Sequence, residues 1–312
     1  MSGRVDVHNH LIPPRYQARL DERGLTAGGL QAPAWSEDLA LAAMDAHGVE
    51  TAVVSVSTPG VHLGDDAEAR ETARQVNEYA AELVGRHPGR FGFFASVTLP
   101  DVEGALAETA YAFDELHADG LILLANVGGR HLGDPEFEPL LAELDRRRAV
   151  VFVHPSTLPG PAVGGIPPYI ADFLLDTTRT AVSLVRADAL RRHPGITFIL
   201  SHGGGFLPFA AHRLAMTSTF DSDRTVEDFL ADLASFRVDT AQTSSPTSLP
   251  AVLEFFGADQ VFFGTDWPHA SDSGVAYFTR RFAEFDLDDA TRRSIECDNA
   301  RALLPRFTTP RA

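Results

Sequence analysis

The chain has 312 residues, of which 44% are hydrophobic and 22% are charged, a balance typical of a globular protein with a large apolar core. Its formal net charge of −17 argues against a nucleic-acid-binding surface, and no apolar run reaches the roughly 18–20 residues of a membrane span. All 26 positively charged residues are arginine, which excludes lysine Schiff bases and a metal-bridging carboxylated lysine. The single cysteine, Cys297, excludes an internal disulfide. The single cysteine, together with the lack of a signal-peptide pattern at the N-terminus, predicts a cytoplasmic protein.

Strand-like and helix-like segments alternate along the chain. Near-continuous apolar runs, typical of buried parallel strands, are expected at 3–8, 51–57, 91–98, 120–125, 149–154, 196–201, 236–241 and 260–265. Helical periodicity predicts helices near 36–47, 66–87, 102–118, 136–148, 170–193, 206–217, 246–257 and 275–285, and a last one at 288–304. This alternation predicts one (β/α)₈ TIM-barrel domain over residues 1–312. A doubly wound open sheet is the alternative, but the glycine-rich phosphate loop expected after its first strand is missing.

Two segments rich in proline and glycine interrupt this alternation. Residues 11–34 follow the first predicted strand, and residues 155–168 follow the fifth. Because both come after the carboxyl end of a strand, we expect them to form long loops over the barrel mouth, where loops commonly shape a substrate pocket.

The most informative motif is the histidine pair at the end of the first strand. His8 and His10 are two positions apart, so an extended strand directs both side chains to one face. His154, His202 and Asp266 stand at or just after the ends of three later predicted strands. In a barrel these strand ends converge on one cavity. Histidine nitrogens and a carboxylate oxygen suit Zn²⁺, Mn²⁺ or Fe²⁺, so the pattern predicts a metal site in the barrel mouth.

These motifs also resemble a known family, the metal-dependent amidohydrolase superfamily. The resemblance is to the branch of aminocarboxymuconate-semialdehyde decarboxylase and related aromatic-acid decarboxylases, and it spans nearly the whole chain. The matching segments are Asp6-Val7-His8-Asn9-His10, His154-Pro155, Ser201-His202-Gly203-Gly204-Gly205 with Pro208-Phe209 and Arg213, Gly264-Thr265-Asp266-Trp267-Pro268, and Asn299-Ala300-Arg301. Within the branch, Asn126, the segment 130–134 and the segment 151–155 are most similar to the 6-methylsalicylate decarboxylase type.

The resemblance implies a ligand set and a catalytic residue. It implies that His8, His10, His154 and Asp266 bind one divalent ion, Zn²⁺ or Mn²⁺. His202 would then be a catalytic residue near the ion, and Asp266 is a second candidate proton donor. The alternative for His202 is a residue that only ends its strand. The glycines that follow it leave bare backbone that a ligand can approach.

Substrate contacts and a partner subunit are further implications. The matching arginine of the resembled decarboxylase reaches into the neighbouring subunit's site, so Arg213 is expected to bind the substrate carboxylate in a homodimer. A surface or intrasubunit ion pair is the alternative for Arg213. Trp267 and His269 follow the metal aspartate and are expected near the substrate, although packing is the favoured alternative for Trp267.

Three functions fit this constellation of residues. The favoured one is metal-dependent, nonoxidative decarboxylation of a small carboxylic acid that is aromatic, of the 2-hydroxybenzoate type, or dienoic. The second is a hydrolase (lactonase or amidohydrolase) or hydratase on the same scaffold, because metal-bound water ionises near neutral pH. The third is a noncatalytic metal- or ligand-binding barrel, which the intact constellation disfavours.

Overall fold

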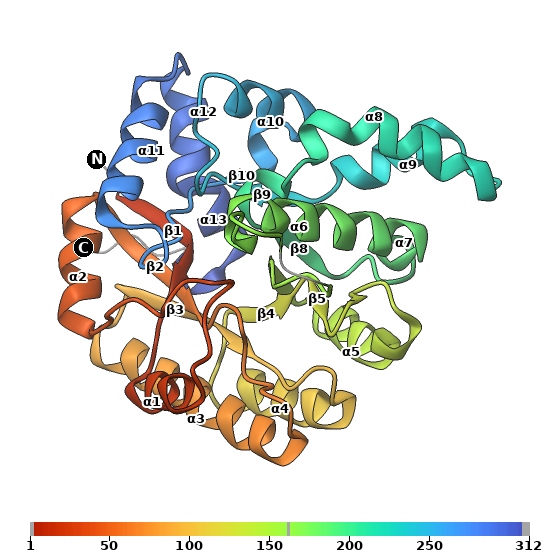
Figure 1. Ribbon diagram of the computed structural model, residues 1–312. Helices are drawn as coiled ribbons and strands as arrows, with labels where there is room; N and C mark the ends of the chain where they lie inside the picture. Colours follow the sequence, from red (N-terminus) through yellow and green to blue (C-terminus); the bar gives the residue numbers. More distant parts are fainter. Residues whose placement is uncertain (1–2, 161–162, 308–312) are drawn as a thin grey trace.

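The computed structural model describes residues 3–160 and 163–307, and its centre is an eight-stranded parallel sheet curled into a barrel (Figure 1). The strands run in the order β1-β2-β3-β4-β7-β8-β9-β10. Their bounds are β1 Arg4–His10, β2 Val49–Ser55, β3 Phe91–Ser96, β4 Gly120–Leu124, β7 Val150–His154, β8 Thr197–Leu200, β9 Arg237–Asp239 and β10 Val261–Phe262. Each expected strand is present, although β9 and β10 are shorter than their apolar runs suggested.

The barrel is closed by the chain that follows β10. The backbone N–H of Val7 donates to the carbonyl of Phe263 at 3.0 Å, and that of His10 donates to Trp267 at 2.8 Å. In the reverse direction the N–H of Asp266 donates to the carbonyl of His8 at 2.7 Å. These bonds join the first strand to the last, as a (β/α)₈ barrel requires and an open sheet does not. The TIM-barrel prediction is therefore confirmed, and the doubly wound alternative is wrong.

The barrel interior is filled by apolar side chains from seven of its eight strands. This cluster comprises Val5, Val7, Val53, Phe94, Ile122, Val150, Phe152, Ile199 and Phe262, together with Cys297, Ala300, Leu304 and Phe307 from the C-terminal segment. Phe94 and Phe152 stack with ring centroids 5.7 Å apart. Among the described residues the barrel interior is thus a packed core and not a pore, so a ligand that enters the barrel finds room at its mouth.

Helices surround the sheet (Figure 1). Their bounds are α1 Pro14–Arg23, α2 Glu37–Ala46, α3 Asp66–Arg86, α4 Val102–Asp114, α5 Glu138–Arg147, α6 Pro168–Arg186, α7 Ala189–Arg192, α8 Leu207–Ser218, α9 Val226–Ala234, α10 Ser248–Phe256, α11 Asp272–Glu284, α12 Asp289–Arg293 and α13 Asn299–Leu303. Ser36, Asp65 and Asp101 cap α2, α3 and α4 by accepting a hydrogen bond from a backbone N–H of the first turn. None of the helices in the described part of the chain is long and apolar enough to cross a membrane.

Some segments differ from their prediction. Residues 11–34 are not simply a loop, because Pro14 begins α1 and Tyr16 and Leu20, four positions apart, bury one face of it. The helix expected at 170–193 is divided into α6 and α7. The helix expected at 288–304 consists of α12, a π-helical turn at Ser294–Asp298, and α13.

Besides α1, three short α-helical or strand elements were not predicted. One is α9, although Thr225 and Asp228 form a capping box that could have revealed it. The others are β5 (Asn126–Val127) and β6 (Arg130–His131), which form a small antiparallel hairpin. Within the second expected loop, at 155–168, residues 161–162 lie outside the described residues.

A β-bulge in β1 directs the first histidine pair. Asp6 pairs with Ala52 of β2 and Asn9 pairs with Val54. Between these two pairs β1 therefore contains one more residue than β2. The extra residue breaks the strict alternation of the strand. As a result, Val7 lies in the interior cluster and yet His8, its neighbour, also faces the barrel axis, with its ring 4.8 Å from that of Phe152.

Candidate active site

Four predicted ligands meet at the carboxyl ends of the strands. His8 and His10 come from β1, His154 from the last residue of β7, and Asp266 from the segment that follows β10. Each offers one ligand atom, and these atoms all lie within 4.8 Å of one another. All four residues are buried. The barrel therefore brings together residues up to 258 positions apart in the sequence, as the strand-end pattern predicted.

Each of the three histidines has its Nδ1 atom beside an acceptor. His8 Nδ1 lies 2.7 Å from Oδ2 of Asp239, and His10 Nδ1 lies 3.1 Å from the carbonyl oxygen of Ser55. His154 Nδ1 lies 2.9 Å from the carbonyl oxygen of the next residue. An Nδ1–H that donates to these oxygens leaves Nε2 of each ring free to bind a metal, an arrangement common among metal-binding histidines.

The spacing of the ligand atoms fits a single cation. Nε2 of His8 lies 3.1 Å from Nε2 of His10, and Oδ1 of Asp266 lies 3.3 Å and 3.1 Å from these two atoms. Ligands about 2.0–2.2 Å from one tetrahedral ion are about 3.4 Å apart, which is close to these separations. Three nitrogens and one carboxylate oxygen suit Zn²⁺, Mn²⁺ or Fe²⁺.

The electrostatics of the site also favour a positive charge there. Burial by itself lowers the pKa of His8, but Asp239 and Asp266 beside it raise that pKa to about 10. Burial by itself raises the pKa of Asp266, but His8 and His10 hold that pKa well below its usual range. Two buried carboxylates beside one imidazole thus favour a positive charge at this point, which a protonated His8 or a bound divalent metal can supply.

His202 lies beside these ligands, on the short 3₁₀ turn His202–Gly204 that follows β8. Its ring centroid is 4.9 Å from that of His8 and 6.0 Å from that of His154. Its backbone N–H donates to Oδ1 of Asp239 at 2.9 Å, and its Nδ1 lies 3.3 Å from the carbonyl oxygen of Ala241. Burial lowers the pKa of His202. A neutral imidazole held in this way can accept or return a proton through Nε2.

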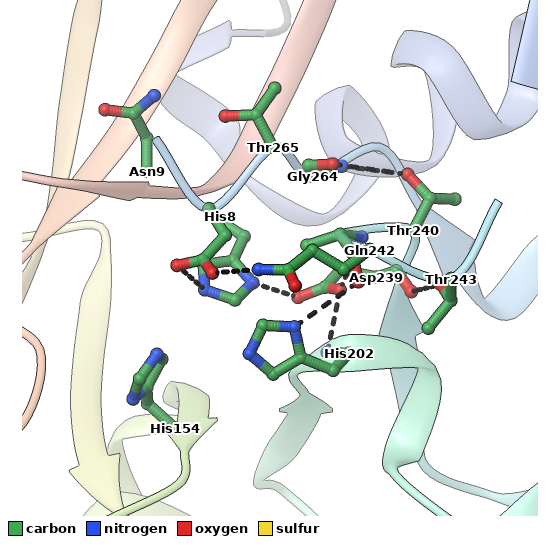
Figure 2. Close-up of polar contacts among 12 residues, drawn as sticks. His8, Asn9, His154, His202, Asp239, Thr240, Gln242, Thr243, Gly264 and Thr265 are labelled. Carbon is green, nitrogen blue, oxygen red and sulfur yellow. Dashed lines mark hydrogen bonds and ion pairs between the residues drawn. The ribbon is translucent and has the colours of Figure 1, made fainter. Parts of the chain in front are cut away.

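Asp239 was not singled out in the sequence, yet it organises the site. Its carboxylate is fully buried and accepts from His8 through Oδ2 and from the backbone N–H groups of His202 and Ala241 through Oδ1. Figure 2 shows His8 and His202 both approaching Asp239. The signal in the sequence was weak, because Arg237 interrupts the apolar run before Asp239 and the expected strand at 236–241 extends beyond it, whereas β9 ends at Asp239.

A cavity of about 750 Å³ opens above these residues. His154, His202 and Asp266 line its base, and His269 lies in its wall with its ring 5.1 Å from that of His10. Burial lowers the pKa of His269 to about 4. Trp267, in contrast, is buried, donates through Nε1 to Asp272 at 3.1 Å, and is not among the described lining residues. Its placement agrees with the packing alternative.

Arg213 lies on α8, away from its own cavity. It is exposed and is not among the described residues that line the cavity. It also makes no ion pair within residues 3–160 and 163–307, so the alternative of an intrasubunit ion pair finds no partner there. The structure thus leaves Arg213 free to contact something outside its own chain.

A metal-binding histidine and aspartate cluster in the mouth of a (β/α)₈ barrel defines a class of metal-dependent barrel enzymes. Comparison with known proteins is more specific, because the family model described as amidohydrolase matches residues 5–306. The chain therefore belongs to the amidohydrolase family.

Several proteins that are similar to this chain are named decarboxylases. The chain is 37% identical to decarboxylase yanB of Aspergillus niger, with 98% of this chain and 89% of that protein covered. It is also 37% identical to the 6-methylsalicylic acid decarboxylase acuB of Aspergillus aculeatus, with 97% and 96% covered. Among solved structures, a 2,6-dihydroxybenzoate decarboxylase in complex with 2,6-dihydroxybenzoate is similar, with a TM-score of 0.82, 25% identity, and 99% and 100% of the two chains covered.

Proposed function

We propose that this protein catalyses the metal-dependent, nonoxidative decarboxylation of a 2-hydroxybenzoate-type monocarboxylic acid that carries an apolar ring substituent. The observation that carries the proposal is the cavity above His154, His202 and Asp266. Its walls are mainly apolar, and no arginine is among its described lining residues. The apolar lining residues include Leu30, Ile170, Phe173, Leu174, Phe206, Val252 and Phe278.

The absence of a cationic side chain from this described lining bears on the substrate. Within one chain, a second carboxylate on the substrate would be transferred from water into an apolar wall without a partner, which is costly. Only Arg213 of a neighbouring subunit, proposed below, could pair with it, so the wall that this chain itself contributes favours a monoacid with an alkyl-bearing ring over a dienoic dicarboxylic acid. Relatives named 6-methylsalicylic acid decarboxylase at 37% and 34% identity support this choice.

The metal ligands in this proposal are His8, His10, His154 and Asp266. A bound divalent ion would supply a positive charge that holds the substrate carboxylate and neighbouring phenolate and stabilises the charge that develops on them. Four protein ligands normally complete a tetrahedral zinc site, so an ion that also binds substrate must expand its coordination. We therefore propose Mn²⁺ or Zn²⁺ as the ion.

His202 and Asp266 are the proposed proton carriers, and each must first take up a proton, because burial keeps the His202 ring neutral and the neighbouring histidines keep Asp266 ionised. The reaction requires a proton on the ring carbon that bears the carboxylate; the bond to the carboxylate then breaks, and its electron pair restores the aromatic ring as CO₂ leaves. His202 is suited to this step because an Nδ1–H that donates to the carbonyl of Ala241 leaves Nε2 to accept a proton from the substrate's phenol or carboxylic acid group and to return it to the ring carbon. His269, neutral near pH 7, is placed to donate a hydrogen bond to a substrate oxygen.

A substrate panel in D₂O tests the proposed reaction. Purified protein with Mn²⁺ or Zn²⁺ is incubated with salicylate, 6-methylsalicylate, an isophthalate and a set of lactones, while CO₂ release and the products are measured. We expect CO₂ from the 6-alkyl monoacid and a phenol that carries deuterium at the carbon that held the carboxylate. Hydrolysis of a lactone with no CO₂ from any acid would contradict the proposal and favour the hydrolase alternative.

We also propose a homodimer in which α8 faces the partner's barrel mouth. Residues spaced three or four positions apart, and therefore on one face of α8 and its two ends, are exposed. They are Phe206, Phe209, Arg213, Met216 and Phe220. Phe209 is 92% exposed and Phe220 79%, which is unusual for phenylalanine and typical of an interaction surface. An apolar stripe around one unpaired arginine supports the idea that Arg213 serves a neighbouring site. Sedimentation of the wild-type protein and of Phe209→Glu tests it, with a monomeric wild type as the contrary result.

A further inference from the structure

Gln242 contacts the carboxylate of the metal site from the cavity side. Its Nε2 donates to Oδ2 of Asp266 at 2.6 Å, while Oδ1 of the same carboxylate faces His8 and His10. Gln242 is exposed to the cavity that it lines. Figure 2 shows its side chain extended beside His8.

The carboxylate of Asp266 can change its orientation mainly by rotation about the side-chain torsions. Its backbone is fixed, because its N–H donates to the carbonyl of His8 at 2.7 Å and its carbonyl accepts from the N–H of Ala270 at 2.7 Å. Within the described residues, Oδ2 accepts a hydrogen bond from Gln242 and from no other side chain. Gln242 thus holds one oxygen of the carboxylate, while His8 and His10 face the other.

The backbone at Gln242 adopts a conformation that is unusual for glutamine. Its φ is 56°, in the left-handed region, and the site residues His202 and Asp266 share that feature with φ values of 53° and 63°. Such strained residues concentrate at functional sites. The loop is anchored on both sides, since Ala241 N–H donates to Asp239 at 2.9 Å and Thr243 N–H donates to the carbonyl of Thr240 at 3.1 Å.

The chemistry of an amide suits this position. An arginine there would also donate to the carboxylate, but its positive charge would repel a divalent cation bound on the other side. A neutral amide donor favours the charged carboxylate without adding charge to the site. It also occupies Oδ2, which would otherwise be free to turn toward the cation as a second ligand atom.

We propose that Gln242 is a positioning residue of the metal site, which holds Oδ2 of Asp266 so that Oδ1 alone is presented to the cation. The inference rests on the proposed metal site and adds a residue to it. Because Gln242 acts through Asp266, its removal changes how the cation is held and not only how fast the substrate reacts.

The test uses two variants and one matched control. Gln242→Leu removes the amide at nearly constant size, and Gln242→Gly removes it while relieving the left-handed backbone. Gln75→Leu is the control, because Gln75 also donates to a carboxylate, Oε1 of Glu71 at 2.7 Å, but on the outer surface of α3. Free Mn²⁺ is titrated by electron paramagnetic resonance, and the visible absorption of the Co²⁺-loaded proteins is recorded.

We expect both Gln242 variants to bind Mn²⁺ about 10–100-fold more weakly than the wild type and to show a changed Co²⁺ spectrum, since loss of a partner that orients a ligand has effects of this size. Gln75→Leu should match the wild type. Wild-type affinity and spectrum in both Gln242 variants would overturn the proposal. Wild-type behaviour in Gln242→Gly alone would also overturn it, because the defect of Gln242→Leu would then come from the strained backbone at this position and not from loss of the amide. A wild-type protein that binds neither ion would overturn the metal site itself.

Discussion

Asp239→Asn should weaken metal binding while leaving the fold nearly intact. The asparagine carbonyl can replace Oδ1 and accept from the N–H groups of His202 and Ala241, both at 2.9 Å in the native protein. Its NH₂ group then replaces Oδ2, which lies 2.7 Å from Nδ1 of His8. Two donors cannot share that contact, so once the His8 ring is neutral, as metal binding requires, its proton must move to Nε2, the atom that would bind the metal.

The size of the effect follows from these contacts. Loss of a partner that orients a metal ligand typically costs 10–100-fold in affinity, or about 1.4–2.7 kcal/mol. Asp239→Ala is more severe, because it leaves three buried donors without an acceptor: Nδ1–H of His8 and the N–H groups of His202 and Ala241. We expect it to lower the free energy of unfolding by about 3–5 kcal/mol, as when one partner of a buried pair is removed.

Competition with a chromophoric chelator measures the metal affinity, and urea unfolding of the metal-free proteins measures stability. Asp259→Asn is a matched control, because Asp259 is exposed on the turn before β10. If Asp239→Asn binds metal as tightly as the wild type, the argument from the His8 proton is wrong. If Asp239→Ala unfolds at the wild-type urea concentration, the three contacts do not contribute as described.

Three further predictions test the site. His202→Ala should keep its metal but lose about 10²–10⁴-fold in kcat, as expected for a proton-transfer group; loss of metal would instead make His202 a ligand, and unchanged turnover would leave it a structural residue. Adding Mn²⁺ or Zn²⁺ at 100 times its dissociation constant should stabilise the chelator-treated protein by about 2.7 kcal/mol, seen as a higher Tm in calorimetry, whereas Asp266→Ala should show little of this shift. If Arg213 acts on the partner's site, a mixture of inactive Arg213→Ala and His202→Ala chains should recover part of the activity; no recovery despite subunit exchange shown by mass spectrometry would contradict this.

Local patterns in the sequence determined the elements of the barrel and the ends at which its chemistry lies. Buried parallel strands have nearly continuous apolar sequences, and the polar residue that follows such a run indicates the carboxyl end of the strand. For that reason His8, His10, His154, His202 and Asp266 could be assigned to one site before their positions were known, and the structure does bring them together. The helix α1 was missed because Pro13 and Pro14 were taken to indicate a loop, although proline is favourable in the first turn of a helix.

Contacts between distant segments decided the rest. Strict alternation would not have placed Val7 and His8 on the same side of β1, and the bulge that does so depends on pairing with β2. Asp239 gains its role only because the barrel brings β9 within 2.7 Å of a histidine 231 positions earlier. The contact of Gln242 with Asp266 and the exposure of Arg213 have the same origin. The partners of a side chain depend on how strands and helices pack around the core, and a local sequence pattern does not contain that information.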